Sequence, residues 1–320
     1  MDTPSVESLP NRRLQTSLEE AHVSEPPEQT APARKPGLLG DLLSLTKPRL
    51  SALVWLTAGG GVWLAPGAVS GTRAALAIGG TILVVAGANA LNNYLERESD
   101  RFMARTASRP LPSERLPPVV ALVMGLFLSV FSVGLLTLGT RPLAGLLAAI
   151  ALVLYVVVYT PLKRRSSVST LVGAIPGALP PLIGWASVTG RADMGGLALF
   201  AVLFLWQIPH SLAIGLYRQS EYEQAGLKVF PIDHGEEATR RQMVLYTLPL
   251  VPLPLVLVHL GIANATTLGL GSLLGFGFLY LVWRGYRDGA GVRWARQVFL
   301  YSLLYLNGLF AALAVDKALF

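Results

Sequence analysis

The sequence contains no cysteine and little charge. Its 320 residues are 52% hydrophobic and only 14% charged, and they include four histidines. Without cysteine the chain forms no disulfide, no thiolate zinc site and no cysteine nucleophile. The apolar content is too high and too clustered for a soluble core, which indicates a membrane protein.

The apolar residues form nine long runs, each sufficient for a helix that crosses the bilayer. These runs cover residues 50–66, 74–95, 117–138, 142–160, 170–189, 194–216, 243–261, 266–285 and 297–316. The sequence therefore predicts an all-α, polytopic membrane bundle of nine transmembrane helices, with a membrane domain at 41–320. Residues 1–40 are rich in proline and acids and lack the apolar core of a secretory signal, so they predict a disordered tail.

The positive charges predict the orientation of this bundle. A net charge of +7 could indicate a nucleic-acid partner, but Lys and Arg gather in the loops after the second, fourth, sixth and eighth runs. Such one-sided sorting is typical of cytoplasmic loops in membrane proteins. We therefore expect these loops and the N-terminus in the cytoplasm, and no nucleic-acid partner.

The loop after the second run begins with polar residues at helical spacing. Asn92, Glu96 and Asp100 recur every four residues and would share one face of a helix. Their oxygens could hold Mg²⁺ together with a substrate phosphate. Three arginines, also four apart, could bind a diphosphate; they are Arg101, Arg105 and Arg109. A solvated loop with Glu–Arg pairs explains the charges equally well but leaves the asparagine unexplained.

Two further segments contain residues suited to chemistry. His210 lies within the sixth run, where it could ligate a metal, contact haem or simply bond to a neighbouring helix. Tyr217 and Glu221 follow, again four apart. After the fourth run, Tyr159 precedes adjacent cations that could attract a diphosphate or merely anchor the helix at the cytoplasmic face; they include Lys163 and Arg164.

Together these segments resemble the UbiA-type intramembrane prenyltransferases, over about residues 42–316. Asn92-Asn93-x-x-Glu96-x-x-x-Asp100 is similar to the metal-binding signature of that family. Several other stretches match in the same order along the chain: Leu45-Thr46-Lys47-Pro48-Arg49, Met103-x-Arg105-Thr106-x-x-Arg109-Pro110, Tyr159-Thr160-x-Leu162-Lys163-Arg164, Gly177-Ala178-Leu179-Pro180-Pro181, Trp206-Gln207-x-Pro209-His210 and Glu221-Tyr222-x-x-Ala225-Gly226.

The resemblance implies a Mg²⁺-dependent transfer of a farnesyl group from farnesyl diphosphate to the vinyl group of haem b, giving haem O, in a bacterial inner membrane. It implies metal ligation by Asn92, Glu96, Asp100 and Glu221, with Tyr217 beside Glu221. It implies substrate binding by Arg101, Arg105, Arg109, Tyr159, Lys163, Arg164, His210 and Arg218. Membrane lipid and the enzyme that oxidises haem O are the other expected partners. Glu96 and Glu221 stand where the family usually has Asp.

Two alternatives remain open at this stage. One is a related prenyltransferase that acts on an aromatic quinone or chlorophyll precursor. The other is a transporter or a non-catalytic haem- or lipid-binding protein. Transporters usually place their polar sites near the middle of the bilayer, whereas the ionisable residues here lie at one face.

Overall fold

The computed structural model describes residues 37–103, 105–288 and 290–319, and the regular structure in these ranges is entirely helical. The first helix, α1, covers Leu38–Leu45. The predicted tail at 1–40 lies outside the described residues except for 37–40. Helix α1 begins before residue 41, and the start of the membrane domain at that residue stays a prediction.

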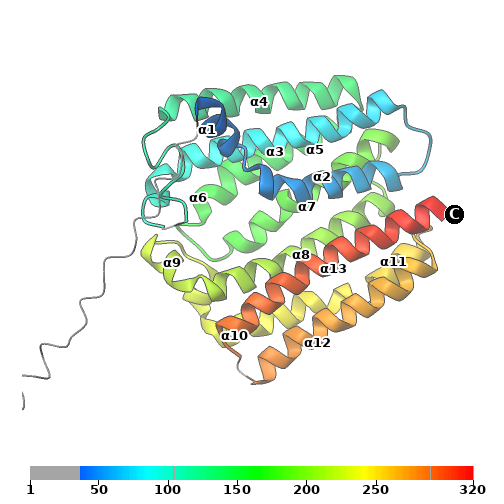
Figure 1. Ribbon diagram of the computed structural model, residues 1–320. Helices are drawn as coiled ribbons and strands as arrows, with labels where there is room; N and C mark the ends of the chain where they lie inside the picture. Colours follow the sequence, from blue (N-terminus) through cyan, green and yellow to red (C-terminus); the bar gives the residue numbers. More distant parts are fainter. Residues whose placement is uncertain (1–36, 104, 289, 320) are drawn as a thin grey trace, which may run out of the picture. The chain divides into compact units, whose positions relative to one another are not determined.

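The long helices lie side by side as a bundle (Figure 1). The first half contains α2 (Pro48–Leu64), α3 (Gly71–Asp100), α4 (Pro118–Gly139), α5 (Pro142–Val153), the π-helical turn η1 (Leu154–Tyr159), α6 (Thr160–Leu162) and α7 (Ser169–Thr189). The second half contains α8 (Met194–Tyr217), α9 (Gln219–Gln224), α10 (Phe230–Thr247), η2 (Leu248–Leu250), α11 (Leu253–His259), η3 (Thr267–Gly271), α12 (Ser272–Asp288) and α13 (Val292–Leu319).

Within the described ranges, eight helical segments are long and apolar enough to cross a membrane, and the apolar part of α2, Ser51–Leu64, is shorter. The prediction of an all-α, polytopic membrane bundle is thus confirmed. Three segments extend further than expected on the charged side: α3 continues to Asp100, α10 begins at Phe230 and α13 begins at Val292. Hydropathy marks only the part inside hydrocarbon, whereas a helix can continue into the polar face.

Helix α7 lies at the centre of the bundle and packs closely on α2. It is the most buried of the candidate spans in the described chain, although it contains three prolines. A side chain in place of Gly61 would overlap the backbone at Pro181, and one at Gly184 would overlap the backbone at Ala58. Small residues let two helix backbones approach each other in membranes. This contact fixes the second half of α2 against α7.

At the end of the bundle away from the charged loops, Asp316 of α13 binds the turn that precedes η3 and α12. Its carboxylate accepts backbone N–H bonds from Asn264 (2.7 Å), Thr266 (3.2 Å) and Thr267 (2.9 Å). Replacement of Asp316 by alanine leaves these N–H groups without an acceptor. Each buried N–H group left in this way lowers the free energy of unfolding by about 1–3 kcal/mol. We expect Asp316→Ala to lower the melting temperature in detergent by several degrees. The control is Asp288→Ala, which removes an exposed ion pair with Arg287 and should leave the melting temperature unchanged.

Candidate active site

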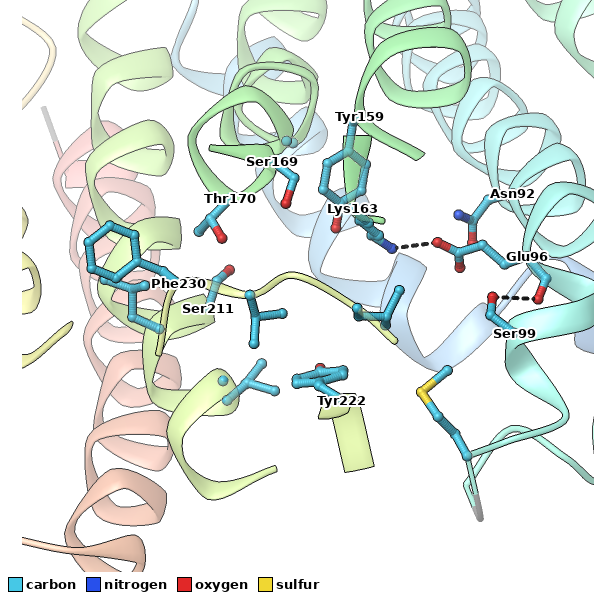
Figure 2. Close-up of a pocket in the computed structure, with 18 of the residues that line it drawn as sticks. Asn92, Glu96, Ser99, Tyr159, Lys163, Ser169, Thr170, Ser211, Tyr222 and Phe230 are labelled. Atoms are coloured by element: carbon cyan, nitrogen blue, oxygen red, sulfur yellow. Dashed lines mark hydrogen bonds and ion pairs between the residues drawn. The ribbon is translucent and has the colours of Figure 1, made fainter. Parts of the chain in front are cut away.

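A cavity of about 350 Å³ opens at the charged end of the bundle, between the ends of α3, α6, α7 and α8 and the segment from α9 to α10 (Figure 2). Four cations and two carboxylates line it, so it favours an anionic ligand. The charged residues are Lys47, Glu96, Asp100, Arg105, Arg109 and Lys163. The remaining lining from α7 and α8 is of mixed polarity: it includes Gly173, Ala174, Gly177 and Leu212, together with the polar Gln207 and Ser211.

The predicted metal motif faces this cavity from the last turns of α3. Asn92 and Asp100 are almost fully buried, each about 1% exposed. Each motif side chain has one oxygen against a cation: Asn92 Oδ1 lies 2.6 Å from Lys47 Nζ, Glu96 Oε1 2.8 Å from Lys163 Nζ, and Asp100 Oδ2 2.7 Å from Arg109 Nη1. The other oxygen of Asp100, Oδ1, is buried without a hydrogen-bond partner among the described residues.

These donors suit a magnesium ion. Mg²⁺ prefers one or two carboxylates and keeps positions for water and phosphate oxygens. The buried, unpartnered Oδ1 of Asp100 is a free anionic ligand atom, and Glu96 and Asn92 add oxygens on the same helix face. In the described part of the chain no three His, Asp or Glu side chains cluster as a ready-made metal site. The site therefore suits a magnesium ion whose remaining ligands come from the bound substrate.

Lysine 163 follows α6 and forms the second wall of the cavity. Its ammonium pairs with Glu96 and lies 4.5 Å from the centre of the Tyr159 ring. Burial alone lowers the pKa of Lys163, but the neighbouring Tyr159 and Glu96 outweigh burial and raise it well above its usual value. The π-helical turn η1 before it presents Tyr155 and Tyr159 to the cavity, with ring centres 5.2 Å apart. Such turns are frequent at functional sites.

The predicted arginines divide between the cavity and the surface. Arg109 contacts Asp100, and the exposed Arg105 lines the cavity rim. Arg101 instead pairs with Glu114 at 2.9 Å and lines a different, shallow pocket. Arg164 is exposed and does not line the cavity. The helical spacing predicted one row of arginines, but α3 ends at Asp100, so the residues beyond it turn in different directions.

The expected second side of the metal site is not in this cavity. Glu221 bonds to Arg218 through both oxygens, at 2.9 and 3.0 Å. These two residues and Tyr217 line a second cavity of about 360 Å³ beside α13, together with Arg296, Phe299 and Leu300. Glu221 therefore does not line the cavity that Asn92, Glu96 and Asp100 line, and its part in the metal site stays a prediction.

A break between two helices explains this separation of Glu221 from the main cavity. Helix α8 ends at Tyr217, and Arg218, with φ −118° and ψ 20°, separates it from α9. Spacing along one continuous helix therefore does not apply across this point. Tyr222, one residue after Glu221, faces the main cavity instead (Figure 2). Burial raises the pKa of Tyr222, so its hydroxyl stays protonated and can donate a hydrogen bond.

His210 lies on the side of α8 that faces α13. Its Nδ1 is 2.7 Å from the Ser302 hydroxyl, and its ring stacks on Trp206 and packs against Phe299, at 4.7 and 5.0 Å between ring centres. It does not line the main cavity. An aromatic path continues from Phe299 to Tyr217, whose rings are 5.8 Å apart, and so links His210 to the second cavity.

Lys47 is the main site residue absent from the predicted set. It precedes α2 and reaches the cavity from a part of the sequence 45 residues before Asn92. Burial, reinforced by the positive charge of Arg109, lowers the pKa of Lys47 to about 7. The motif Leu45-Thr46-Lys47-Pro48-Arg49 marks this segment as part of the family resemblance. No residue spacing in the sequence, however, predicts that Lys47 contacts α3. Tyr155 and Tyr222 were also missed, and each lies in or beside a segment that we had singled out.

Known proteins are similar to this chain over most of its length. Two bacterial proteins named Protoheme IX farnesyltransferase match most of the chain. That of Myxococcus xanthus (strain DK1622) is 51% identical over 282 residues, which cover 88% of this chain and 96% of the relative. That of Sorangium cellulosum (strain So ce56) is 55% identical over 248 residues, covering 78% and 89%.

Solved structures share the fold. A digeranylgeranylglyceryl phosphate synthase has a TM-score of 0.76 at 17% identity and covers 88% of this chain and 99% of its own. A UbiA homolog from Archaeoglobus fulgidus, bound to DMAPP and Mg²⁺, has a TM-score of 0.64 at 17% identity, covering 86% and 99%. The model of the UbiA prenyltransferase family matches residues 53–304, and this chain therefore belongs to that family.

Proposed function

We propose that this multi-pass membrane protein transfers the farnesyl group of farnesyl diphosphate to the vinyl group of haem b and so makes haem O. The observation that carries this proposal is identity of about half of all residues to bacterial protoheme IX farnesyltransferases over nearly their whole length. A cavity lined by four cations and also by small and apolar residues supports it, because a prenyl diphosphate has an anionic and an apolar part.

The reaction breaks the allylic C–O bond of farnesyl diphosphate and releases diphosphate. The farnesyl carbon then bonds to the terminal vinyl carbon of haem, and water adds to the inner vinyl carbon with loss of a proton. Bound Mg²⁺ would neutralise charge on the departing diphosphate. We assign the magnesium ligands to Asn92, Glu96 and Asp100.

The residues of the cavity would assist this bond cleavage through electrostatics. Arg105, Arg109 and Lys163 would hold the diphosphate oxygens, because cations fixed at a developing anion lower the barrier. The faces of Tyr155 and Tyr159 would stabilise the allylic cation. The apolar part of the cavity would bind the farnesyl chain, at about 0.8 kcal/mol for each buried CH₂ group, and exclude water.

The acceptor side is proposed along α8 and α13. The second cavity has two guanidinium groups, those of Arg218 and Arg296, lying 5.3 and 5.8 Å from the centre of the Tyr217 ring. Arginine pairs well with carboxylates, and haem carries two propionates. His210 lies further along the aromatic path and is proposed to contact the haem.

The orientation is also proposed. Helix α2 has 17 residues, which rise about 25 Å and suffice for a ninth crossing when its ends lie in the interface. Nine crossings place the cavity and the N-terminus on the side with most Lys and Arg, the cytoplasmic side of a bacterial inner membrane.

Incubation of the purified protein with Mg²⁺, farnesyl diphosphate and haem b tests the function. We expect a product with the mass of haem O and an equivalent amount of pyrophosphate. Removal of Mg²⁺ by a chelator should abolish both. If farnesyl diphosphate instead modifies an aromatic quinone precursor while haem b remains unchanged, the assigned acceptor is wrong.

Substitution of His210 separates the two substrates. We expect His210→Gln to raise the KM for haem b about tenfold, because one polar contact to the acceptor is lost, and to leave the KM for farnesyl diphosphate unchanged. Steady-state kinetics with each substrate varied in turn provides the measurement. His259→Gln, at the end of α11, is the matched control. Equal effects on both KM values would contradict the assignment of His210 to the acceptor.

A further inference from the structure

The hydroxyl of Ser302 determines how the His210 ring is hydrogen-bonded. Ser302 lies on α13, is fully buried and donates to the Phe299 carbonyl at 2.6 Å. Its oxygen also lies 2.7 Å from His210 Nδ1. A serine hydroxyl has a single proton, and the Phe299 carbonyl already takes it, so toward His210 the hydroxyl accepts. Nδ1 therefore carries the imidazole proton, and Nε2 of the neutral ring keeps its lone pair.

The packing of His210 and its hydrogen bond fix different properties of the ring. Trp206 stacks on the ring and Phe299 packs against it, at 4.7 and 5.0 Å between ring centres. This packing sets the plane of the ring but admits two orientations related by a half-turn, because the carbon and nitrogen positions have nearly the same shape. The bond to Ser302 distinguishes the two. Ser302 is itself held in place, since its backbone carbonyl accepts from Trp206 Nε1 at 2.6 Å.

The other ring nitrogen, Nε2, is left available to a ligand. Within the described chain it has no hydrogen-bond partner, and it is not among the polar atoms that are fully enclosed without one. His210 lies seven residues before Tyr217 on α8, roughly 10 Å along the helix from the second cavity. A haem with its propionates at Arg218 and Arg296 would extend in this direction, because its apolar part avoids the polar face.

A nitrogen with a lone pair and no proton selects one part of a haem. It binds a group that donates a proton or accepts an electron pair. Ionised propionates and vinyl groups do neither, whereas the haem iron accepts the lone pair of an imidazole. The opposite tautomer, with the proton on Nε2, would instead donate to a propionate. The bond between Nδ1 and Ser302 thus decides which part of the acceptor His210 contacts.

We propose that Ser302 is a positioning residue for the acceptor, which holds His210 in the tautomer and orientation that present Nε2 to the iron of haem b. This inference rests on the proposed function, in which haem b is the acceptor. It assigns a role to a residue of α13 that none of the sequence motifs includes. A group that accepts from the second nitrogen of a metal-binding histidine orients the ring and makes it a stronger electron donor.

The test uses the full chain in detergent with haem b as the probe. Resonance Raman spectra of bound ferrous haem b report the iron–histidine stretching band, and titration followed by absorbance measures the affinity. The variants are Ser302→Ala, which removes the hydroxyl, and Ser302→Thr, which keeps it. The matched control is Ser132→Ala on α4, which removes another fully buried hydroxyl bonded to the carbonyl three residues earlier, that of Ser129. A melting curve for each variant reports folding.

For the wild type we expect an iron–histidine band that His210→Gln abolishes. Ser302→Ala should shift this band to lower frequency, because Nδ1 loses its acceptor, and weaken haem b binding about tenfold. It should stay folded, since Trp206 bonds only to the backbone of residue 302. Ser302→Thr should keep the wild-type band, and Ser132→Ala should change neither band nor affinity.

A wild-type spectrum without this band, or with a band that His210→Gln leaves unchanged, overturns the inference. A folded Ser302→Ala variant with the wild-type band and affinity also overturns it. If that variant does not fold, Ser302→Val replaces it, because valine has the shape of threonine without the hydroxyl. Identical bands in the valine and threonine variants then overturn the inference. The proposed function fails separately, if the wild type shows the band but converts no haem b to haem O.

Discussion

Glu96→Gln and Asp100→Asn are each expected to reduce farnesyl transfer by about 10²–10³-fold while the protein stays folded. Both substitutions keep the size of the side chain and remove its negative charge. Asp100 matters most, since its Oδ1 is buried and unpartnered among the described residues while its Oδ2 contacts Arg109. An amide there offers a weaker ligand and no charge to balance a bound cation.

Product mass and pyrophosphate release measure this effect, and Mg²⁺ titration identifies its cause. We expect the remaining activity of both variants to require more Mg²⁺. The matched control is Glu98→Gln on the same helix, whose exposed side chain pairs with Arg97 and Arg101 and does not line the main cavity. Full activity in Asp100→Asn would remove the metal assignment, whatever the behaviour of Glu96→Gln.

The metal motif could be predicted because it depends on one regular helix. Asn92, Glu96 and Asp100 are four residues apart, and α3 is helical through all of them, so local spacing was sufficient. Glu221 could not be placed in this way, because the chain leaves the helical conformation at Arg218, between α8 and α9. The pattern of four-residue spacing looks identical in the sequence in both cases.

The place of Lys47 depends on contacts that no local pattern contains. Its segment meets α3 through Asn89 and Asn93, which donate to the carbonyls of Thr46 and Leu45, and through the packing of Leu45 against Ala90. These bonds also explain why asparagines occur near the motif, which the interpretation of this segment as a solvated loop does not. Asn93 lies within the motif segment, and its amide holds the link between α1 and α2.

The helical class and the approximate places of the apolar helices followed from the sequence, because the bilayer imposes a minimum apolar length. Among the described residues, eight of the nine expected spans reach that length, and α2 is the shorter one. Their ends did not, and the most informative residues are at those ends. The site residues from Asn92 to Asp100 lie in the last turns of α3, most of them beyond the expected end at residue 95. Similarly, the residues of α10 that line the cavity, Phe230 and Pro231, precede the expected start at residue 243.

Lys163→Met is expected to abolish most activity and also to destabilise the protein. The buried Lys163–Glu96 pair, at 2.8 Å, would leave an unpaired carboxylate, and breaking such a pair costs about 3–5 kcal/mol. The raised pKa of Lys163 keeps its ammonium charged at neutral pH, so the variant loses a full positive charge near the diphosphate. We expect transfer to decrease by about 10²–10³-fold and the melting temperature to fall by several degrees.

The double variant Lys163→Met, Glu96→Gln separates these two effects. It removes both charges, so no buried carboxylate remains unpaired, and we expect most of the lost thermal stability to return. Activity should remain as low as in the single variants, because neither the metal ligand nor the cation is restored. If the double variant regains both stability and farnesyl transfer, the pair only maintains the fold, and the diphosphate must be held by Arg105, Arg109 and Lys47 alone.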